Sequence, residues 1–161
     1  MKKTNVARIL EGLKISYEIL EYKVDVSDLG ADNVAQKINI PLAQVFKTLV
    51  VYGDKTGVLL VCIPGSLELD LKALATVSGN KKVEMVPLKD VQKLTGYIRG
   101  GVSPIGTKKQ YDVYIDESMM LWTYISISAG IRGSLILIAP NDLVCAVNGK
   151  IFNISREMAL E

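Results

Sequence analysis

FKTLVVYGDKTGVLLVCI, residues 46–63, contains two runs rich in β-branched and large apolar residues, at 46–52 and 57–63. The four residues between the runs, Gly53-Asp54-Lys55-Thr56, are typical of a turn. The stretch therefore predicts an antiparallel β-hairpin, and a sheet that grows outward from it.

The flanking sequence alternates between helical and strand patterns. Capping residues and glycines predict helices at 4–13, 33–38, 41–45, 70–78, 87–96 and 141–147, the last capped by Asn141 or Asp142. Apolar runs predict further strands at 15–22, 83–86, 113–116, 123–128, 134–138 and 151–154. We expect one domain over residues 1–161, of the α+β class. Its mixed, mostly antiparallel sheet curls, partly like a barrel, with helices outside.

The composition excludes several classes of protein. The chain has 161 residues, of which 49% are hydrophobic and 22% charged, so it can form an independent core. Its 19 basic and 17 acidic residues leave a net charge of +2, too little for a protein that binds nucleic acid through a global positive field. It has no histidine, which excludes Ser-His and Cys-His nucleophile pairs and zinc sites with histidine ligands. We expect no metal and no cofactor.

Two cysteines, Cys62 and Cys145, lie in the apolar contexts LLVCIPG and DLVCAVN. Neither has a second ligand at metal-binding spacing, so we expect both to be buried, reduced thiols. No apolar run reaches the ~18 residues that cross a bilayer, and no secretory leader is evident. We expect a cytoplasmic protein.

Lys47 is a candidate functional residue because it interrupts an apolar strand. A buried ammonium is costly unless it has a partner or a task. Lys47 could bind a phosphate or polarise a carbonyl oxygen. Alternatively, it lies on a solvent-exposed face of the strand.

The glycine-rich stretch GGVSPIG at 100–106 is a second candidate. Gly100, Gly101, Ser103 and Pro104 can bring the backbone close to a ligand and direct amide groups at an oxygen. A plain surface loop is the alternative. The stretch lacks the Gly-Lys-Ser/Thr of a phosphate-binding loop and follows no clear strand of a βαβ unit.

A third candidate is SISAGIRG at 126–133, between two predicted strands. Ser128, Gly130 and Arg132 offer a hydroxyl, flexible backbone and a guanidinium suited to phosphate, although a hairpin turn needs no function. Asp142 has two interpretations as well: it caps a helix, or it faces a substrate amine.

In this order, VFKTL (45–49), LDLK (69–72), KKVEM (81–85), TGY (95–97), GGVSPIG (100–106) and SAGIRG (128–133) resemble the YbaK/EbsC family. These are aminoacyl-tRNA editing proteins, relatives of the editing domain inserted in bacterial prolyl-tRNA synthetases. The resemblance runs from near Thr4 to about Ile154. It implies a YbaK-like fold and a deacylase that removes cysteine from Cys-tRNA(Pro), acting in trans beside prolyl-tRNA synthetase on the acceptor 3′ end.

The resemblance also implies roles for single residues. Lys47 matches the essential lysine of the family, and the stretch containing Gly101 matches its glycine-proline loop. Tyr22 and Asp142 match residues that line the pocket. Leu29 stands where an aromatic pocket residue is expected, so the pocket is expected to differ in shape there.

In the cysteine-specific branch of the family, the thiol of the substrate attacks its own ester carbonyl, and no protein nucleophile is needed. We expect Gly101 and nearby amides to stabilise the oxyanion, and Lys47 to bind the carbonyl oxygen or the terminal ribose-phosphate. Two alternatives remain. One is an Ala-tRNA(Pro) deacylase that uses a bound water; the other is a non-catalytic module that binds an RNA end or a nucleotide. Neither a membrane nor DNA is expected as a partner.

Overall fold

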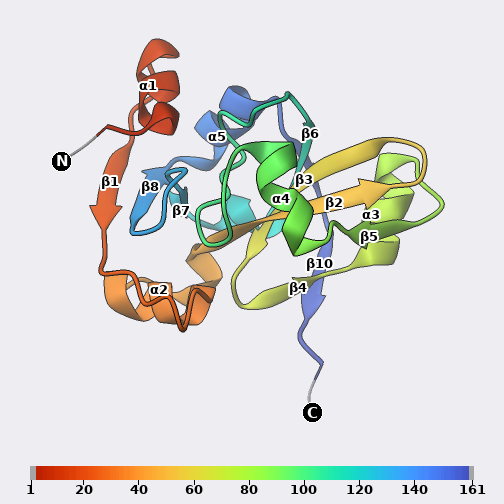
Figure 1. The fold of residues 1–161 in the computed structure, drawn as a ribbon, viewed down its shortest axis with the longest axis horizontal. Helices are drawn as coiled ribbons and strands as arrows, with labels where there is room; N and C mark the ends of the chain where they lie inside the picture. The colour runs from red at the N-terminus through yellow and green to blue at the C-terminus, as the bar shows by residue number, and fades with distance from the viewer. Residues whose placement is uncertain (1–2, 160–161) are drawn as a thin grey trace.

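The structure, a computed structural model, describes residues 3–159, which fold into three β-sheets with helices around them (Figure 1). The largest sheet has the strand order β5-β2-β3-β6-β9. Its strands are β2 (Phe46–Gly53), β3 (Gly57–Pro64), β5 (Val83–Met85), β6 (Asp112–Asp116) and β9 (Lys150–Phe152). The predicted hairpin is confirmed as β2 and β3, which pair along their whole length. β5 adds antiparallel to β2, whereas β6 and β9 add in parallel.

Two smaller sheets complete the β structure. A three-stranded antiparallel sheet has the order β1-β8-β7, and a two-stranded sheet pairs β10 with β4. Their strands are β1 (Glu18–Glu21), β4 (Leu67–Leu69), β7 (Ile125–Ser128), β8 (Ser134–Ile138) and β10 (Ser155–Glu157). The expected α+β class with a mixed, mostly antiparallel arrangement is confirmed. The sheets stay open and do not close into a barrel.

The helices lie close to their predicted positions, although α2 begins at Ala31, two residues before the predicted start. They are α1 (Asn5–Gly12), α2 (Ala31–Ile38), α3 (Leu71–Ser78), α4 (Leu88–Thr95) and α5 (Pro140–Val147), with 3₁₀ turns η1 (Leu42–Gln44) and η2 (Glu117–Leu121). Thr4 and Asp70 accept amide hydrogen bonds at the starts of α1 and α3, and Gly79 ends α3 in the left-handed conformation. The predicted cap of α5 is wrong: Ala139 is the N-cap, because Pro140 is suited to the first helical position.

Apolar side chains cover both faces of the large sheet. Along β3, Leu60 and Cys62 face a core shared with α1, β7 and β8, whereas Leu59 and Val61 face a second core shared with α3. This alternation follows the two-residue period of a strand. Cys62 is buried as expected, but Cys145 is exposed on α5, which corrects the expectation for that thiol. Within residues 3–159, no helix is both long and apolar enough to span a bilayer.

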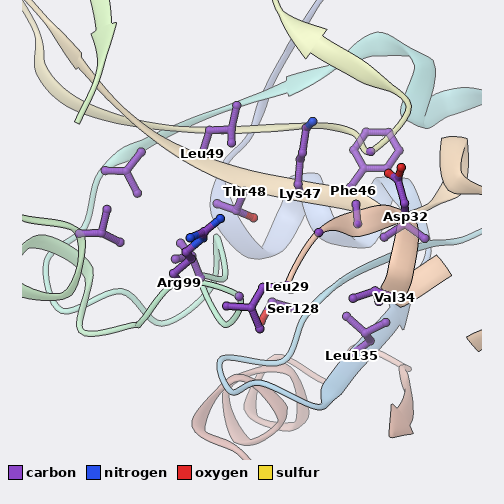
Figure 2. Close-up of a pocket in the computed structure, with 18 of the residues that line it drawn as sticks. Leu29, Asp32, Val34, Phe46, Lys47, Thr48, Leu49, Arg99, Ser128 and Leu135 are labelled. Atoms are coloured by element: carbon purple, nitrogen blue, oxygen red, sulfur yellow. The ribbon is translucent and has the colours of Figure 1, made fainter. Parts of the chain in front are cut away.

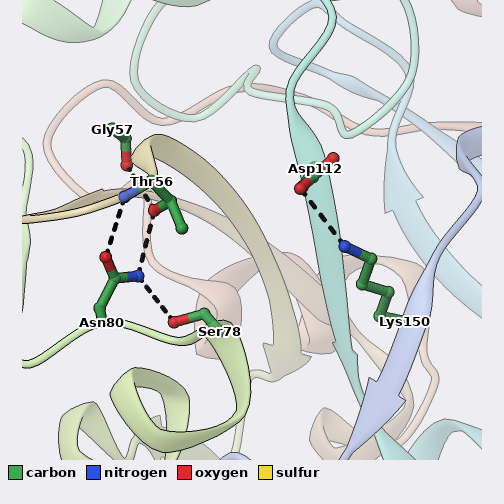
Figure 3. Close-up of polar contacts among 6 residues, drawn as sticks. All are labelled: Thr56, Gly57, Ser78, Asn80, Asp112 and Lys150. Carbon is green, nitrogen blue, oxygen red and sulfur yellow. Dashed lines mark hydrogen bonds and ion pairs between the residues drawn. The ribbon is translucent and has the colours of Figure 1, made fainter.

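Polar contacts hold the hairpin tip, and an ion pair of Lys150 on β9 with Asp112 on β6 lies at the parallel edge (Figure 3). Asn80, after α3, accepts hydrogen bonds from the amides of Lys55 and Thr56 and donates to the hydroxyl oxygens of Thr56 and Ser78. A Cβ on Gly53 would come within 2.4 Å of the Asn80 side chain, so this close approach requires glycine. The turn is thereby fixed to α3, which holds β2 in place from its far end.

Candidate functional site

A cavity of about 600 Å³ opens along the first half of β2. Its walls come from α2, the segment that precedes α2, the start of α4, the loop at 99–102, and the adjoining strands β7 and β8. Figure 2 shows side chains from these elements gathered around β2. Segments far apart in sequence therefore build one site.

Lys47 lines this cavity and is half-buried. Burial lowers the pKa of its ammonium group, while the negative charges of Asp32 and Glu68 act to raise it. Asp32 lies in the first turn of α2 and Glu68 lies on β4, so the two carboxylates that influence Lys47 come from different elements. A partly desolvated ammonium acts more strongly on a nearby oxygen than one in bulk water.

The glycine loop approaches the cavity from the opposite wall. Gly100 lines it and has φ +84°, a conformation that favours glycine. The Nε of Arg132 donates to the carbonyl of Arg99 at 2.7 Å, which fixes the loop to the β7–β8 turn. Gly101 is buried, and its amide donates to the carbonyl of Ile98 at 2.9 Å.

The loop residues that follow Gly101 are packed inside the protein. Ser103 and Pro104 are buried, and the Ser103 hydroxyl accepts from the amide of Ile105 at 3.2 Å. Ser128 lines the cavity, and its hydroxyl accepts from the amide of Gly130. These bonds shape the two turns that face β2.

The structure thus brings together part of the predicted set. The predicted residues that line the cavity are Tyr22, Leu29, Lys47, Gly100 and Ser128. Those that do not line it but lie in the two adjoining loops are Gly101, Ser103, Pro104, Gly130 and Arg132. Asp142 lies in the first turn of α5 and is not among the lining residues. The role of each remains a prediction.

Sequence reasoning missed Asp32, Glu68 and Arg99. Asp32 and Arg99 line the cavity, and Glu68 influences Lys47. An acidic residue in the first turn of a helix and an arginine next to two glycines were visible signals. Neither signal alone distinguishes a site residue from a solvent-exposed one.

Neither of the two cysteines lines this cavity. Cys62 lies opposite Thr48 in the sheet, and burial raises the pKa of its thiol to about 12. The Thr48 hydroxyl is 3.7 Å from the Cys62 sulfur, and Cys62 does not line the cavity. Cys145 is on α5 and does not line the cavity. Any thiol chemistry here must use a thiol of the ligand.

Comparison with known proteins gives concordant results. Residues 29–145 match the family described as "Aminoacyl-tRNA editing domain". A protein of Enterococcus faecalis with the provisional name Cys-tRNA(Pro)/Cys-tRNA(Cys) deacylase EbsC is 46% identical over 96% of this chain and 94% of its own length. A proline–tRNA ligase of Brachyspira hyodysenteriae is 28% identical over 60% of this chain and 17% of its own length. A crystal structure described provisionally as a trans-editing enzyme for prolyl-tRNA synthetase shares the fold, with a TM-score of 0.82, 23% identity, and coverage of 96% of this chain and 99% of that one.

Proposed function

Because the chain belongs to the aminoacyl-tRNA editing domain family, we propose that it is a deacylase that removes cysteine from mischarged Cys-tRNA(Pro). The 46% identity to the Enterococcus protein over nearly both whole chains supports this substrate. Its proposed place of action is the cytoplasm, where aminoacyl-tRNA is used.

One observation carries the proposal: Lys47 and Gly100 line the same cavity, in a chain with no histidine. The lining hydroxyls of Thr48 and Ser128 therefore have no imidazole to activate them. A reaction here depends on positioning and charge, which suits a substrate that carries its own nucleophile.

In the proposed reaction, the sulfur of the cysteinyl group attacks the carbonyl carbon of its own ester. The ester C–O bond then breaks, and the thiol proton ends on the departing ribose oxygen. The products are a cyclic thiolactone and intact tRNA. Because the attack is intramolecular, holding the reacting atoms close can supply a large effective concentration.

The residues of the cavity have distinct proposed tasks. The ammonium group of Lys47 stabilises the negative charge that develops on the carbonyl oxygen. Tyr22, Leu29 and Ser128 form walls that limit the positions of the aminoacyl group. Arg132 holds the glycine loop through the carbonyl of Arg99.

The decisive test is a deacylation assay with Cys-tRNA(Pro), Ala-tRNA(Pro) and Ser-tRNA(Pro) in parallel. We expect fast release from Cys-tRNA, with thiolactone as the product in mass spectra. Serine is nearly the same size as cysteine but is a poorer nucleophile, so its ester should persist. Equal rates for the alanine ester would indicate attack by water, and binding without release would indicate a non-catalytic module.

We further propose that the protein acts beside prolyl-tRNA synthetase, which would select the tRNA. Support comes from the 27–28% identity to segments of two proline–tRNA ligases. If this is correct, adding the synthetase should increase the preference for Cys-tRNA(Pro) over other Cys-tRNAs. An unchanged preference would contradict the partnership.

A further inference from the structure

The cavity lies along an open edge of β2. Five consecutive residues, 46–50, line it. Side chains of a strand alternate between the two faces of a sheet, so one face would supply only every second residue. A run of five indicates that the ligand space touches the strand from its edge, where the backbone is accessible.

The hydrogen bonds around the cavity identify which backbone groups face this edge. β5 pairs with the second half of β2, and the amide of Val86 donates to the carbonyl of Val50 at 3.0 Å. Groups two residues apart along a strand face the same edge. The amide and carbonyl of Thr48 therefore face the same edge as the Val50 carbonyl, toward the cavity.

The gap in the pairing is short. At its near end, the backbone of Val45 forms a bridge to Ser126 of β7. At its far end lies the bond between Val86 and Val50. Between them, no strand within residues 3–159 pairs with Thr48 on this edge. Thr48 presents one donor and one acceptor to the cavity.

We propose that the aminoacyl group of the substrate pairs with the backbone of Thr48 as though it were one residue of an added strand. This inference rests on the proposed function. An aminoacyl ester has an ammonium donor and a carbonyl acceptor on either side of its Cα, as a residue has its N–H and C=O. Two residues opposite each other in an antiparallel hydrogen-bonded pair exchange both bonds. The carbonyl of Thr48 accepts from the ammonium, and its amide donates to the ester carbonyl oxygen.

Two further observations favour Thr48 as the oxyanion donor. The amide of Gly101, the sequence-based candidate, already donates to the carbonyl of Ile98. The amide of Thr48 is adjacent in the chain to Lys47, which lines the same cavity. A fixed amide and a partly desolvated charge then act on one oxygen as it becomes negative.

A backbone substitution tests this pairing directly. Replacing Thr48 with its α-hydroxy acid turns the amide at position 48 into an ester and removes that N–H. We expect single-turnover release from Cys-tRNA(Pro) to fall about 100-fold, as when one oxyanion donor is lost. The matched control is the same change at Val51, which also removes one N–H from β2 but does not line the cavity. Because the amide of Val51 faces β3 whereas that of Thr48 faces the cavity, the Val51 ester should unfold at the lower temperature, so slow release by the Thr48 ester alone would not reflect unfolding.

A substrate analogue tests the second bond without altering the protein. 3-Mercaptopropionyl-tRNA retains the thiol and ester but lacks the amino group, so it can still form the same thiolactone ring. For each substrate, the rate enhancement is the enzymatic rate divided by the uncatalysed rate. The enhancement for the analogue should be at least about tenfold lower than that for Cys-tRNA, because a charged hydrogen bond is lost. Unchanged release by the Thr48 ester protein, or an equal ratio for the analogue, would overturn the pairing while leaving the proposed function intact. No release by the unmodified protein would refute both.

Discussion

The two halves of β2 differ in what borders them. The half from Val51 to Gly53 is paired on both edges, with β3 on one side and β5 on the other. The half from Phe46 to Leu49 is paired with β3 and borders the cavity with its other edge. One continuous strand thus supplies both the rigid centre of a sheet and an accessible site. The paired half should matter for stability, and the open half for activity.

Lys47→Ala should give the largest effect, because it alters the half of β2 that borders the cavity. Loss of the ammonium group should lower the single-turnover rate on Cys-tRNA(Pro) about 100- to 1,000-fold, because charge stabilisation of the oxyanion is lost. The circular dichroism spectrum should stay unchanged. Lys55→Ala, at the exposed hairpin tip, is the matched control and should retain activity. A Lys47→Ala protein with normal turnover would remove this residue from the site.

Val51→Ala tests the half of β2 that is paired on both edges. The Val51 side chain is fully buried in the core shared with α3. Its truncation should lower the free energy of unfolding by about 2 kcal/mol, measured by urea denaturation, because buried methyl groups are lost and a cavity remains. Turnover by the folded fraction should be unaffected. A tenfold loss of turnover without a loss of stability would contradict the division between the halves.

Gly101→Ala tests whether the loop opposite β2 must keep its place. An added Cβ would lie 3.2 Å from the carbonyl carbon of Ile131, and a backbone neighbour cannot easily yield. The loop should shift, and kcat/KM should fall about tenfold because the cavity loses its geometry. Gly12→Ala is the control, since a Cβ there meets nothing within 4 Å. Equal activity of the two proteins would show that the loop position is not critical.

The pH dependence gives the smallest expected effect. In the proposed mechanism Lys47 acts in its protonated form, so the rate should fall as the pH rises through the lowered pKa of that lysine, below the ordinary 10.5. The charges of Asp32 and Glu68 raise this pKa, so Asp32→Asn or Glu68→Gln should move the fall to lower pH. Rates are corrected for spontaneous ester hydrolysis at each pH. Asp54→Asn, at the hairpin tip, should leave the profile in place; a shift equal to that of Glu68→Gln would contradict the assignment.

The sequence predicted those parts of the fold that local interactions determine. The hairpin of β2 and β3 has its turn signal between its strands, and Asp70 and Gly79 mark the ends of α3 within a few residues. The three-residue strands β4 and β10 were missed because each is stabilised by a partner some 88 residues away, as in the ion pair of Arg156 with Glu68. The strands β6 and β9 were predicted close to their positions, but their parallel pairing follows from tertiary packing, which no local pattern records.

The candidate site was predictable to a similar extent. Lys47 stood out because a lysine within an apolar strand is costly, and it does line the cavity. Asp32 and Glu68 could not be assigned to it, because they are distant in sequence and meet Lys47 only through the fold. The role proposed for the amide of Thr48 could not be predicted from the sequence either, since the accessibility of a backbone group depends on whether another strand pairs beside it.

The short gap beside β2 also bears on self-association. An exposed sheet edge can template the addition of a strand from another copy of the chain, which is a route to aggregation. Here the unpaired edge spans only residues 46–49 between the bridge at Val45 and the bond at Val50, and it is recessed in a cavity. Very short accessible edges are one way in which proteins avoid pairing with a strand of another chain. The edge can therefore stay open to a small ligand without inviting fibre growth.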